Sequence, residues 1–366
     1  KGDDMALRTM AVIDGDGHMI ESEAEIGEFA DGVMQEWLHR PYRRPGIFPG
    51  LDGFHFPQFG EEQGGEAPPQ VARPYVRASE NRMGSGEDWT ALLDRAEIEQ
   101  AVLFPTLGLS VGFIQVPDYA TRLCRAFNDY VAHRYRKVDS RLHPMALIPM
   151  QDPKAAALEL RRAVKELGLL GAMLPSTGLT LHLGHEYYFP VYQEAADLGC
   201  VLAAHGGSNR GLGMDTFTNF TASHILHHPV PLAMALCSMV YHGVFERWPG
   251  LRVGYMEGGA AWLAMVLDRA DRDEKFEMPG VGRRRMRPCL DSGNILIGCE
   301  GEDPILPYLI GRTGAHLYAY SSDYPHETDL VRAQEEIEET VEHHELSAAD
   351  KVAILGENSR RFFITR

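Results

Sequence analysis

Short apolar runs alternate with longer amphipathic segments along most of the chain. Each apolar run ends at a polar residue, a glycine or a proline, and each is short enough to form a single strand. Strands of a parallel sheet that is covered on both faces read as continuous apolar runs. We therefore expect eight parallel strands, at residues 11–13, 101–104, 145–148, 171–174, 201–204, 251–256, 295–297 and 317–320.

Segments with helical spacing lie between these runs. In residues 119–138, apolar side chains recur every three or four positions, as on the buried face of a helix. Further helices are expected over 153–167, 189–198, 231–245 and 260–276. Pro153 stands where a proline favours a helix start, and Gly199 stands where a glycine favours a helix end.

The alternation of strand and helix predicts the fold class. Strand–helix repeats build parallel sheets, and eight of them build a closed barrel. We expect an α/β protein with a (β/α)8 TIM barrel. A doubly wound open sheet is the alternative, but the glycines at 206, 207, 211 and 213 lack the spacing of dinucleotide- or phosphate-binding loops.

Two segments interrupt the alternation. Residues 22–88 are rich in glycine and proline and carry several aromatic side chains, among them Trp37 and Phe48. A segment of this length inside a compact domain is usually functional or disordered, and its aromatic content argues against disorder. We expect residues 22–88 to cap the mouth of a single domain spanning 1–366, and residues 208–228 to form a second insertion.

Ionisable residues follow several of the expected strands. A polar turn over residues 14–17 is expected after the first strand, and it brings Asp16 and then His18. His205 follows the fifth strand, Glu257 the sixth and Asp323 the eighth. Any one of them has an ordinary interpretation, such as a hydrogen-bonded core histidine or a helix-start acid. Active sites of (β/α) barrels, however, lie at the carboxyl ends of the strands. Charges buried together there cost several kcal/mol each unless a cation compensates them, so the pattern predicts a metal-dependent enzyme.

The first of these clusters has a spacing that suits metal binding. In an extended segment, Asp16 and His18 lie on the same face because the strand period is two residues. Glu21 follows where the chain leaves the barrel. Three roles are open for Glu21: a ligand of a second metal ion, a residue that supports the ligands of the first metal ion, or an acid at the protein surface.

Further candidates lie near the later strands. His224, His227 and His228 cluster ahead of a proline, but no glutamate stands beside His224 as a zinc metalloprotease motif requires. We expect His228 to face the site and the other two to be surface or loop residues. His326 is expected to hydrogen-bond the substrate or a ligand, and Glu300, after the seventh strand, is a weaker candidate for substrate contact.

Composition narrows the class of partner and compartment. The net charge of −17 and the pI of about 5.4 disfavour nucleic acid and anionic membranes as partners. No apolar stretch approaches the ~18–20 residues of a membrane span, and residues 1–10 lack the apolar region of a signal peptide. The 5 cysteines are widely spaced and without a CxxC pair, which disfavours both disulfides and structural zinc. We expect a cytoplasmic protein.

Several motifs in a fixed order resemble the amidohydrolase-related branch of the amidohydrolase superfamily. They are DGHMIE at 16–21, AHGG at 204–207, FERWPGLRV at 245–253, EGGAAW at 257–262, SDYPH at 322–326 and GEN at 356–358. The resemblance implies a barrel with a metal at its mouth. It implies Asp16, His18, His205 and Asp323 as metal positions and Asp323 also as the acid/base group. Trp262, in the fourth motif, becomes a candidate for substrate binding.

The resemblance also implies a range of activities. Family members include hydrolases, hydratases and non-oxidative decarboxylases of aromatic acids, and a homodimer or related homo-oligomer is common among them. The decarboxylases carry a histidine where this chain has Glu257. Four carboxylates and three imidazoles would then form a carboxylate-rich site that suits one or two iron, manganese or zinc ions: Asp16, Glu21, Glu257 and Asp323 with His18, His205 and His228. It is similar to that of a few relatives that activate oxygen with two iron, or manganese and iron, ions.

We therefore expect a metal-dependent hydrolase or carboxy-lyase. Its substrate is expected to be a small aromatic or carboxylate-bearing molecule. Either metal-activated water hydrolyses this molecule or the enzyme removes its carboxylate. Asp323 is expected to act as the acid/base group, and His228 and His326 are expected to assist it. Two alternatives stay open. One is a dinuclear non-heme iron or manganese–iron oxygenase on the same fold, and the other is a non-catalytic partner subunit.

Overall fold

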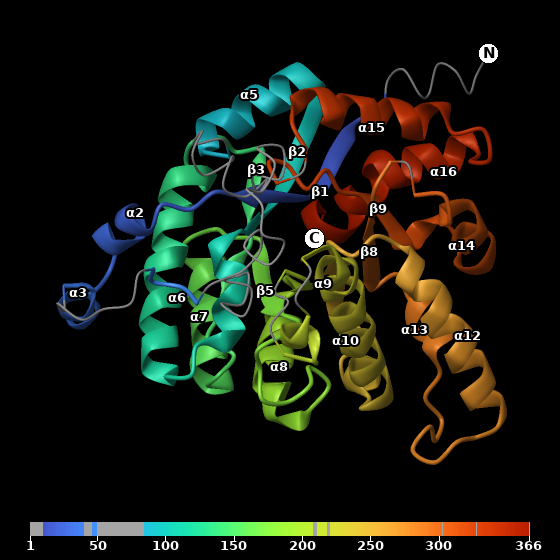
Figure 1. The fold of residues 1–366 in the computed structure, drawn as a ribbon, viewed down its shortest axis with the longest axis horizontal. Helices are drawn as coiled ribbons and strands as arrows, with labels where there is room; N and C mark the ends of the chain where they lie inside the picture. Colours follow the sequence, from blue (N-terminus) through green and yellow to red (C-terminus); the bar gives the residue numbers. More distant parts are fainter. Residues whose placement is uncertain are drawn as a thin grey trace, which may run out of the picture.

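The computed structural model describes residues 10–39, 46–49, 84–207, 211–217, 220–301, 303–326 and 328–365. Within these ranges, parallel strands lie at the centre and helices lie around them (Figure 1). The strands are β1 (Val12–Met19), β2 (Ile98–Pro105), β3 (Leu142–Pro144), β4 (Ala146–Leu147), β5 (Gly171–Pro175), β6 (Val201–His205), β7 (Arg252–Met256), β8 (Ile295–Cys299) and β9 (Tyr318–Tyr320). Every expected apolar run overlaps a strand. The third run, 145–148, holds β4, whereas β3 lies just before it and was not expected.

The strands pair in sequence order. One sheet has the order β1-β2-β3 and the other runs from β4 to β9, with every pair parallel. Only Met145 separates the two sheets along the chain. On the other side, the Asp323 amide donates to the Asp16 carbonyl at 2.9 Å and the His18 amide donates to the Tyr324 carbonyl at 2.6 Å. These bonds join the segment after β9 to β1, so the first and last strands of the chain lie next to each other.

The first strand is longer than the sequence pattern predicted. The polar residues 14–17 were expected to form a turn, but β1 continues through them to Met19 with every residue buried. The reason is tertiary, because the Asp14 carboxylate accepts hydrogen bonds from the Ser322 amide at 3.0 Å and from the Ser322 hydroxyl. Gly17 admits the Trp89 ring, which would lie 2.1 Å from a Cβ atom at this position.

Helices cover the outside of the strands. The main ones are α5 (Gly86–Ala96), α6 (Pro117–Val131), α7 (Pro153–Lys165), α8 (Phe189–Leu198), α9 (Phe220–His227), α10 (Pro229–Tyr241), α11 (Val244–Arg247), α12 (Ala261–Lys275), α13 (Met286–Leu290), α14 (Leu306–Thr313), α15 (Leu330–Glu342) and α16 (Ala348–Val352). The expected helices are confirmed, with the fourth divided into α10 and α11. Asp152 caps α7 ahead of its first-turn proline, and Gly199 ends α8 in the left-handed conformation.

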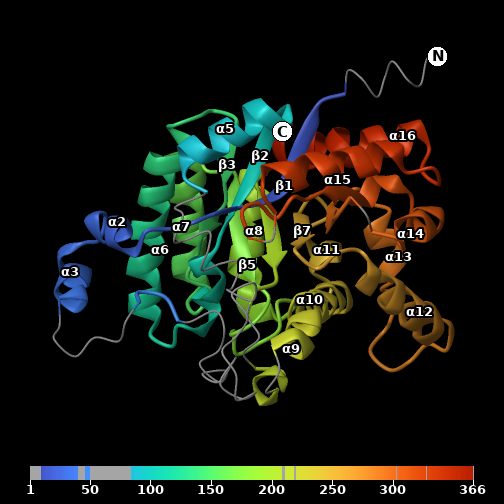
Figure 2. The ribbon, with the colours of Figure 1, turned by 45° about the horizontal axis from the view of Figure 1, so that its top comes forward.

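The segment expected to cap the barrel is described only in part. It contributes α2 (Glu23–Glu28) and α3 (Gly32–Leu38), which contact α6 and lie outside it in both views (Figures 1 and 2). Phe48 packs edge-on against Phe127 of α6, with 6.3 Å between ring centroids. Residues 40–45 and 50–83 fall outside the described ranges, so the cap stays a prediction.

Two expectations drawn from composition can be compared with the structure. Among the described helices, none combines the length and the apolar character that crossing a membrane requires. All five cysteines are free, and Cys200 and Cys299 are buried, as expected of small core residues.

Candidate metal centre

The carboxyl ends of the strands bring the expected ligands together. Asp16 and His18 lie on β1, His205 ends β6, Glu257 follows β7 and Asp323 follows β9. Two groups of potential metal ligands share His18. One combines it with Asp16 and His205, and the other with Glu257, Asp323 and His326. The convergence that was expected from strand order therefore occurs in three dimensions.

His18 is the common member, and its protonation is set by a backbone carbonyl. Its Nδ1 lies 2.9 Å from the Pro105 carbonyl oxygen, which can only accept, so Nδ1 carries the hydrogen. Burial and the nearby His326 and His205 imidazoles hold the pKa of His18 well below its usual value. The ring is therefore neutral, and Nε2 presents a lone pair.

That lone pair faces carboxylate oxygens. Nε2 of His18 lies 3.3 Å from Asp323 Oδ1 and 3.7 Å from both Asp16 Oδ1 and Glu257 Oε2. Among the described residues it has no hydrogen-bond partner, and neither has Asp16 Oδ2. Acceptors that face acceptors in a buried site repel one another unless a cation lies between them. Nitrogen and carboxylate donors together suit a divalent transition metal, so the residues fit such an ion.

His205 is held in the same way. Its Nδ1 lies 2.9 Å from the Gly206 carbonyl oxygen, and its Nε2 lies 3.2 Å from Asp16 Oδ1. Burial lowers its pKa, but the Asp16 carboxylate more than offsets this, and the pKa of His205 is raised overall. His205 Nε2 and Asp16 Oδ1 are thus close enough to share a proton or to bind the same metal ion.

Glu257 lies between two groups of imidazoles. Its Oε2 is 3.2 Å from His205 Nδ1, and its Oε1 is 3.5 Å from His228 Nδ1. Glu257 and Asp323 both adopt left-handed backbone conformations, with φ of 57° and 52°. Such conformations are uncommon outside glycine and concentrate at functional sites.

A chain of polar contacts formed by Asp323, His326 and Thr106 adjoins His18. Asp323 Oδ1 lies 2.9 Å from His326 Nδ1, and His326 Nε2 lies 2.7 Å from the Thr106 hydroxyl. The rings of His18 and His326 stack with centroids 3.9 Å apart. The expected contact of His326 with a ligand residue is thus present, through Asp323.

Glu21 does not belong to either of the two groups of potential metal ligands that share His18. Its two carboxylate oxygens accept hydrogen bonds at 3.0–3.1 Å from the backbone amides of Thr106, Leu107 and Gly108. Burial raises the pKa of Glu21 to about 7. Of the roles left open for Glu21, the structure favours support, because the carboxylate orders the loop that carries Thr106. The interpretation as an exposed surface acid is wrong.

Two candidates for substrate contact are less well placed. Glu300 is exposed after β8. Trp262 is buried in the first turn of α12, and its indole nitrogen has no hydrogen-bond partner among the described residues. Both assignments stay predictions.

Three residues that hold the metal centre in place were not identified from the sequence. Asp14 ties β1 to Ser322, Thr106 holds His326, and Trp89 donates its indole N–H to the His18 carbonyl at 2.8 Å. The spacing of Asp14, Asp16 and His18 by two residues was an available signal, because it predicts one face of a continuing strand. Thr106 and Trp89 carried no local signal.

A cavity begins where β5 ends. It has a volume of about 280 Å³ and is lined by Phe113, residues 175–179 and parts of the second insertion and α10. Ser176, at its edge, donates a hydrogen bond to the His205 carbonyl at 2.6 Å. A cavity of about 150 Å³ is enough for benzene, so this one has room for a substituted ring.

Comparison with known proteins identifies the family. The family model for amidohydrolases matches residues 13–364. The chain belongs to the amidohydrolase family. This amidohydrolase is 25% identical over 298 residues to gamma-resorcylate decarboxylase of Polaromonas sp., a match covering 74% of this chain and 85% of the relative. The resemblance inferred from the motifs is confirmed.

A second relative matches over a shorter region. It is the 2-amino-3-carboxymuconate-6-semialdehyde decarboxylase of Dictyostelium discoideum, 29% identical over 170 residues. The match covers 46% of this amidohydrolase and 46% of the relative, so it spans about half the length of either protein.

Solved structures establish the fold. A 5-carboxyvanillate decarboxylase variant from Novosphingobium aromaticivorans, with bound manganese and 3-methoxy-4-hydroxy-5-nitrobenzoic acid, has a TM-score of 0.71 at 17% identity. The match covers 98% of this amidohydrolase and 99% of that chain. An amidohydrolase of Mycobacterium avium subsp. paratuberculosis has a TM-score of 0.75 at 19% identity, with the same coverage. The prediction of a (β/α)8 TIM barrel is confirmed.

Proposed function

We propose that this amidohydrolase is a metal-dependent carboxy-lyase that decarboxylates a small aromatic acid without oxidation. The observation that carries the proposal is the neutral His18, whose Nε2 lies among three carboxylates and directly beside Asp323. Relatives named as decarboxylases favour decarboxylation over the hydrolysis that was equally expected from the sequence.

Asp16, His18, His205 and Asp323 would hold the metal ion, with Glu257 alongside. A divalent cation bound there supplies Lewis-acid stabilisation of negative charge on the substrate oxygens. Manganese is favoured over iron and zinc, because a structural neighbour contains it. The residues themselves would place the ring carbon that bears the carboxylate within reach of Asp323. They would also limit the access of water, since Asp16, His18 and His205 are almost fully buried.

Asp323 and His326 would move the proton. In its protonated form, Asp323 transfers its proton to the ring carbon that bears the carboxylate. The bond from that carbon to the carboxylate then breaks, its electron pair returns to the ring, and carbon dioxide leaves. His326, fixed by Thr106, supplies the next proton to Asp323 across 2.9 Å. General acid catalysis of this kind contributes about 10²–10⁴-fold in rate.

The cavity after β5 suits the ring of such a substrate. None of the metal-centre residues lines this cavity, and its link to the centre is Ser176, which bonds the His205 carbonyl. The cavity combines apolar lining with the hydroxyl groups of Ser176 and Thr177. An apolar pocket with few polar groups is typical of small-molecule sites. We propose hydroxylated benzoic acids as the substrate class, in keeping with the compounds in the names of the relatives.

Glu257 supports a second candidate, the dinuclear oxygenase. Its carboxylate approaches imidazoles on both sides, as a ligand shared by two ions would. Oxygen uptake that depends on substrate and is abolished in Glu257→Gln would favour this function.

The test is an anaerobic assay of the manganese-loaded protein against a panel of hydroxybenzoic acids, following carbon dioxide release. We expect turnover without oxygen, and a fall of about 10²–10⁴-fold in kcat for Asp323→Asn. Asp329→Asn is the matched control, because Asp329 is an exposed helix cap that asparagine replaces well. Activity only in the presence of oxygen, or equal activity of Asp323→Asn and wild type, would overturn the proposal.

A further inference from the structure

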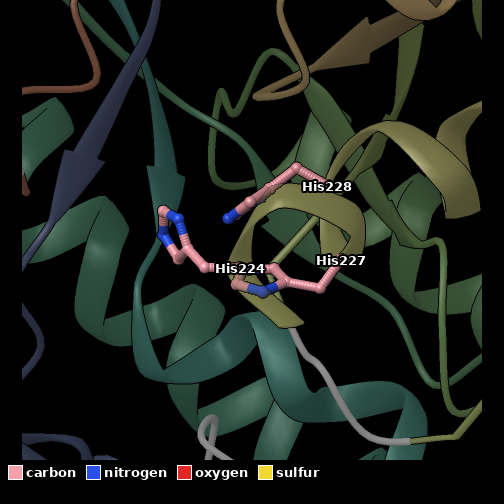
Figure 3. A group of neighbouring side chains, drawn as sticks. All are labelled: His224, His227 and His228. Atoms are coloured by element: carbon pink, nitrogen blue, oxygen red, sulfur yellow. The ribbon is translucent and has the colours of Figure 1, made fainter. Parts of the chain in front are cut away.

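A second group of potential metal ligands lies beside the centre described above. His224 and His227 lie on the last turns of α9, and His228 immediately precedes α10. Their ring centroids are 3.9 Å apart for His227 and His228, 4.7 Å for His224 and His227, and 5.4 Å for His224 and His228. Figure 3 shows the rings of His224 and His228 directed toward one another.

The burial of this group corrects the expectation from sequence. His227 was expected at the surface, but it is only 5% exposed, and His228 is 8% exposed. Nδ1 of each ring has no hydrogen-bond partner among the described residues. A buried polar atom without a hydrogen-bond partner destabilises the fold, and a bound cation would satisfy both nitrogens.

We infer that His224, His227 and His228 form a second cation site, which takes a divalent transition metal such as zinc. One nitrogen from each ring lies within 4.8 Å of the others. Bonds of about 2.1 Å in tetrahedral geometry place ligand nitrogens about 3.4 Å apart, so small side-chain rotations close the site. Three imidazoles select zinc, copper or nickel over magnesium and calcium, which prefer oxygen.

The fourth position of this site faces the first centre. Glu257 Oε1 lies 3.5 Å from His228 Nδ1, while Oε2 of the same carboxylate faces His205 and His18. Glu257 is therefore within reach of both sites and can complete the ligand set of either. The histidine site is built from other residues and stands whether or not the first centre catalyses decarboxylation.

The test measures metal stoichiometry, which does not depend on activity. The full chain is stripped with a chelator, dialysed against zinc, and analysed by elemental mass spectrometry. We expect two equivalents for the wild type and one for His224→Ala and for His227→Ala. His224 is only partly buried, so its variant is expected to fold, and thermal unfolding checks this. His344→Ala is the matched control, because His344 also stacks on a neighbouring histidine but is exposed, and it should keep two equivalents.

Asp16→Asn separates the two sites. We expect this variant to lose the zinc of the first centre and to keep that of the histidine site. One equivalent in the wild type and none in Asp16→Asn would overturn the histidine site and leave the first centre standing. Two equivalents in Asp16→Asn would instead count against the first centre, and two in His224→Ala would overturn the histidine site.

Discussion

At the scale of single residues, the centre depends on which nitrogen of each imidazole carries hydrogen. Backbone carbonyls of Pro105 and Gly206 fix Nδ1–H in His18 and His205, and both rings then turn Nε2 toward carboxylates. Bonds of this kind orient metal-binding histidines and raise their basicity. The same reasoning applies to His326, because the Thr106 hydroxyl determines how that ring meets Asp323.

Thr106→Val tests this arrangement. The variant keeps the shape of the side chain but removes the hydroxyl that bonds His326, so we expect kcat to fall about tenfold for the loss of one hydrogen bond. The pH dependence of kcat should also change, because the ring proposed to reprotonate Asp323 loses the hydrogen bond that positions it. Metal content should not change.

Thr121→Val is the matched control for Thr106→Val. The Thr121 hydroxyl bonds the Pro117 carbonyl on the exposed side of α6, away from the centre. Its kcat and pH profile should equal those of the wild type. An unchanged pH profile in Thr106→Val would show that Thr106 has no role in positioning His326.

At the scale of elements, β1 is held by contacts on both of its sides. Trp89 of α5 covers Gly17 and donates to the His18 carbonyl, while Asp14 anchors the segment that follows β9. The loop after β2 is ordered separately by Glu21. These contacts place Asp16 and His18 at a defined height in the barrel.

Gly17→Ala should disrupt this packing. A Cβ atom would lie 2.1 Å from the Trp89 ring, which is fully buried and cannot move aside freely. We expect the free energy of unfolding to fall by about 1–3 kcal/mol or more, measured by urea denaturation.

Gly311→Ala is the control for that substitution. Gly311 lies within α14, and a Cβ there would meet nothing within 4 Å. Alanine should stabilise this helix by up to about 1 kcal/mol. Equal stability of Gly17→Ala and wild type would show that Trp89 does not pack as described.

At the scale of the whole molecule, acidic groups outnumber basic ones and some of them are buried. The net charge is −17. Glu336 of α15 is only 6% exposed, although Arg332 Nε lies 3.2 Å from its Oε1. Burial raises the pKa of Glu336 from 4.5 to about 8 despite this arginine. The extent of the single domain and the cap over its mouth stay predictions at this scale.

The Glu336 carboxyl makes stability depend on pH. Its pKa is higher in the folded state, so the folded protein retains this proton where the unfolded chain has lost it. The contribution of the protonated Glu336 carboxyl to the free energy of unfolding is fully present below about pH 4.5. This contribution is lost as the pH rises through about 8. Each pKa unit corresponds to about 1.4 kcal/mol, and local relaxation reduces the total. We expect Glu336→Gln to be more stable than wild type by about 1–2 kcal/mol at pH 9 and similar to it at pH 4.5.

Thermal unfolding from pH 4.5 to 9 measures this difference. Glu339→Gln is the matched control, because Glu339 lies on the same helix and pairs with the same arginine but is 37% exposed. The difference in stability between Glu339→Gln and the wild type should not grow with pH. A constant difference between Glu336→Gln and wild type across the range would contradict the prediction.

The sequence by itself determined the barrel and most of the candidate ligands. Strands of a parallel barrel are local apolar runs, and their carboxyl ends meet at one mouth. Asp16, His18, His205, Glu257 and Asp323 could therefore be grouped without coordinates. The amidohydrolase family could be inferred for the same reason, because its motifs are short and local.

Only the tertiary structure decided how these residues are held. Glu21 meets Gly108, and Asp14 meets Ser322, across separations of 87 and 308 residues. Those contacts favour loop support among the three roles left open for Glu21, and they continue β1 through residues where a turn was expected. The burial of His227 was decided in the same way. Pairing between distant segments leaves no periodic signal in the chain, so neither protonation nor burial of these groups could be read from local pattern.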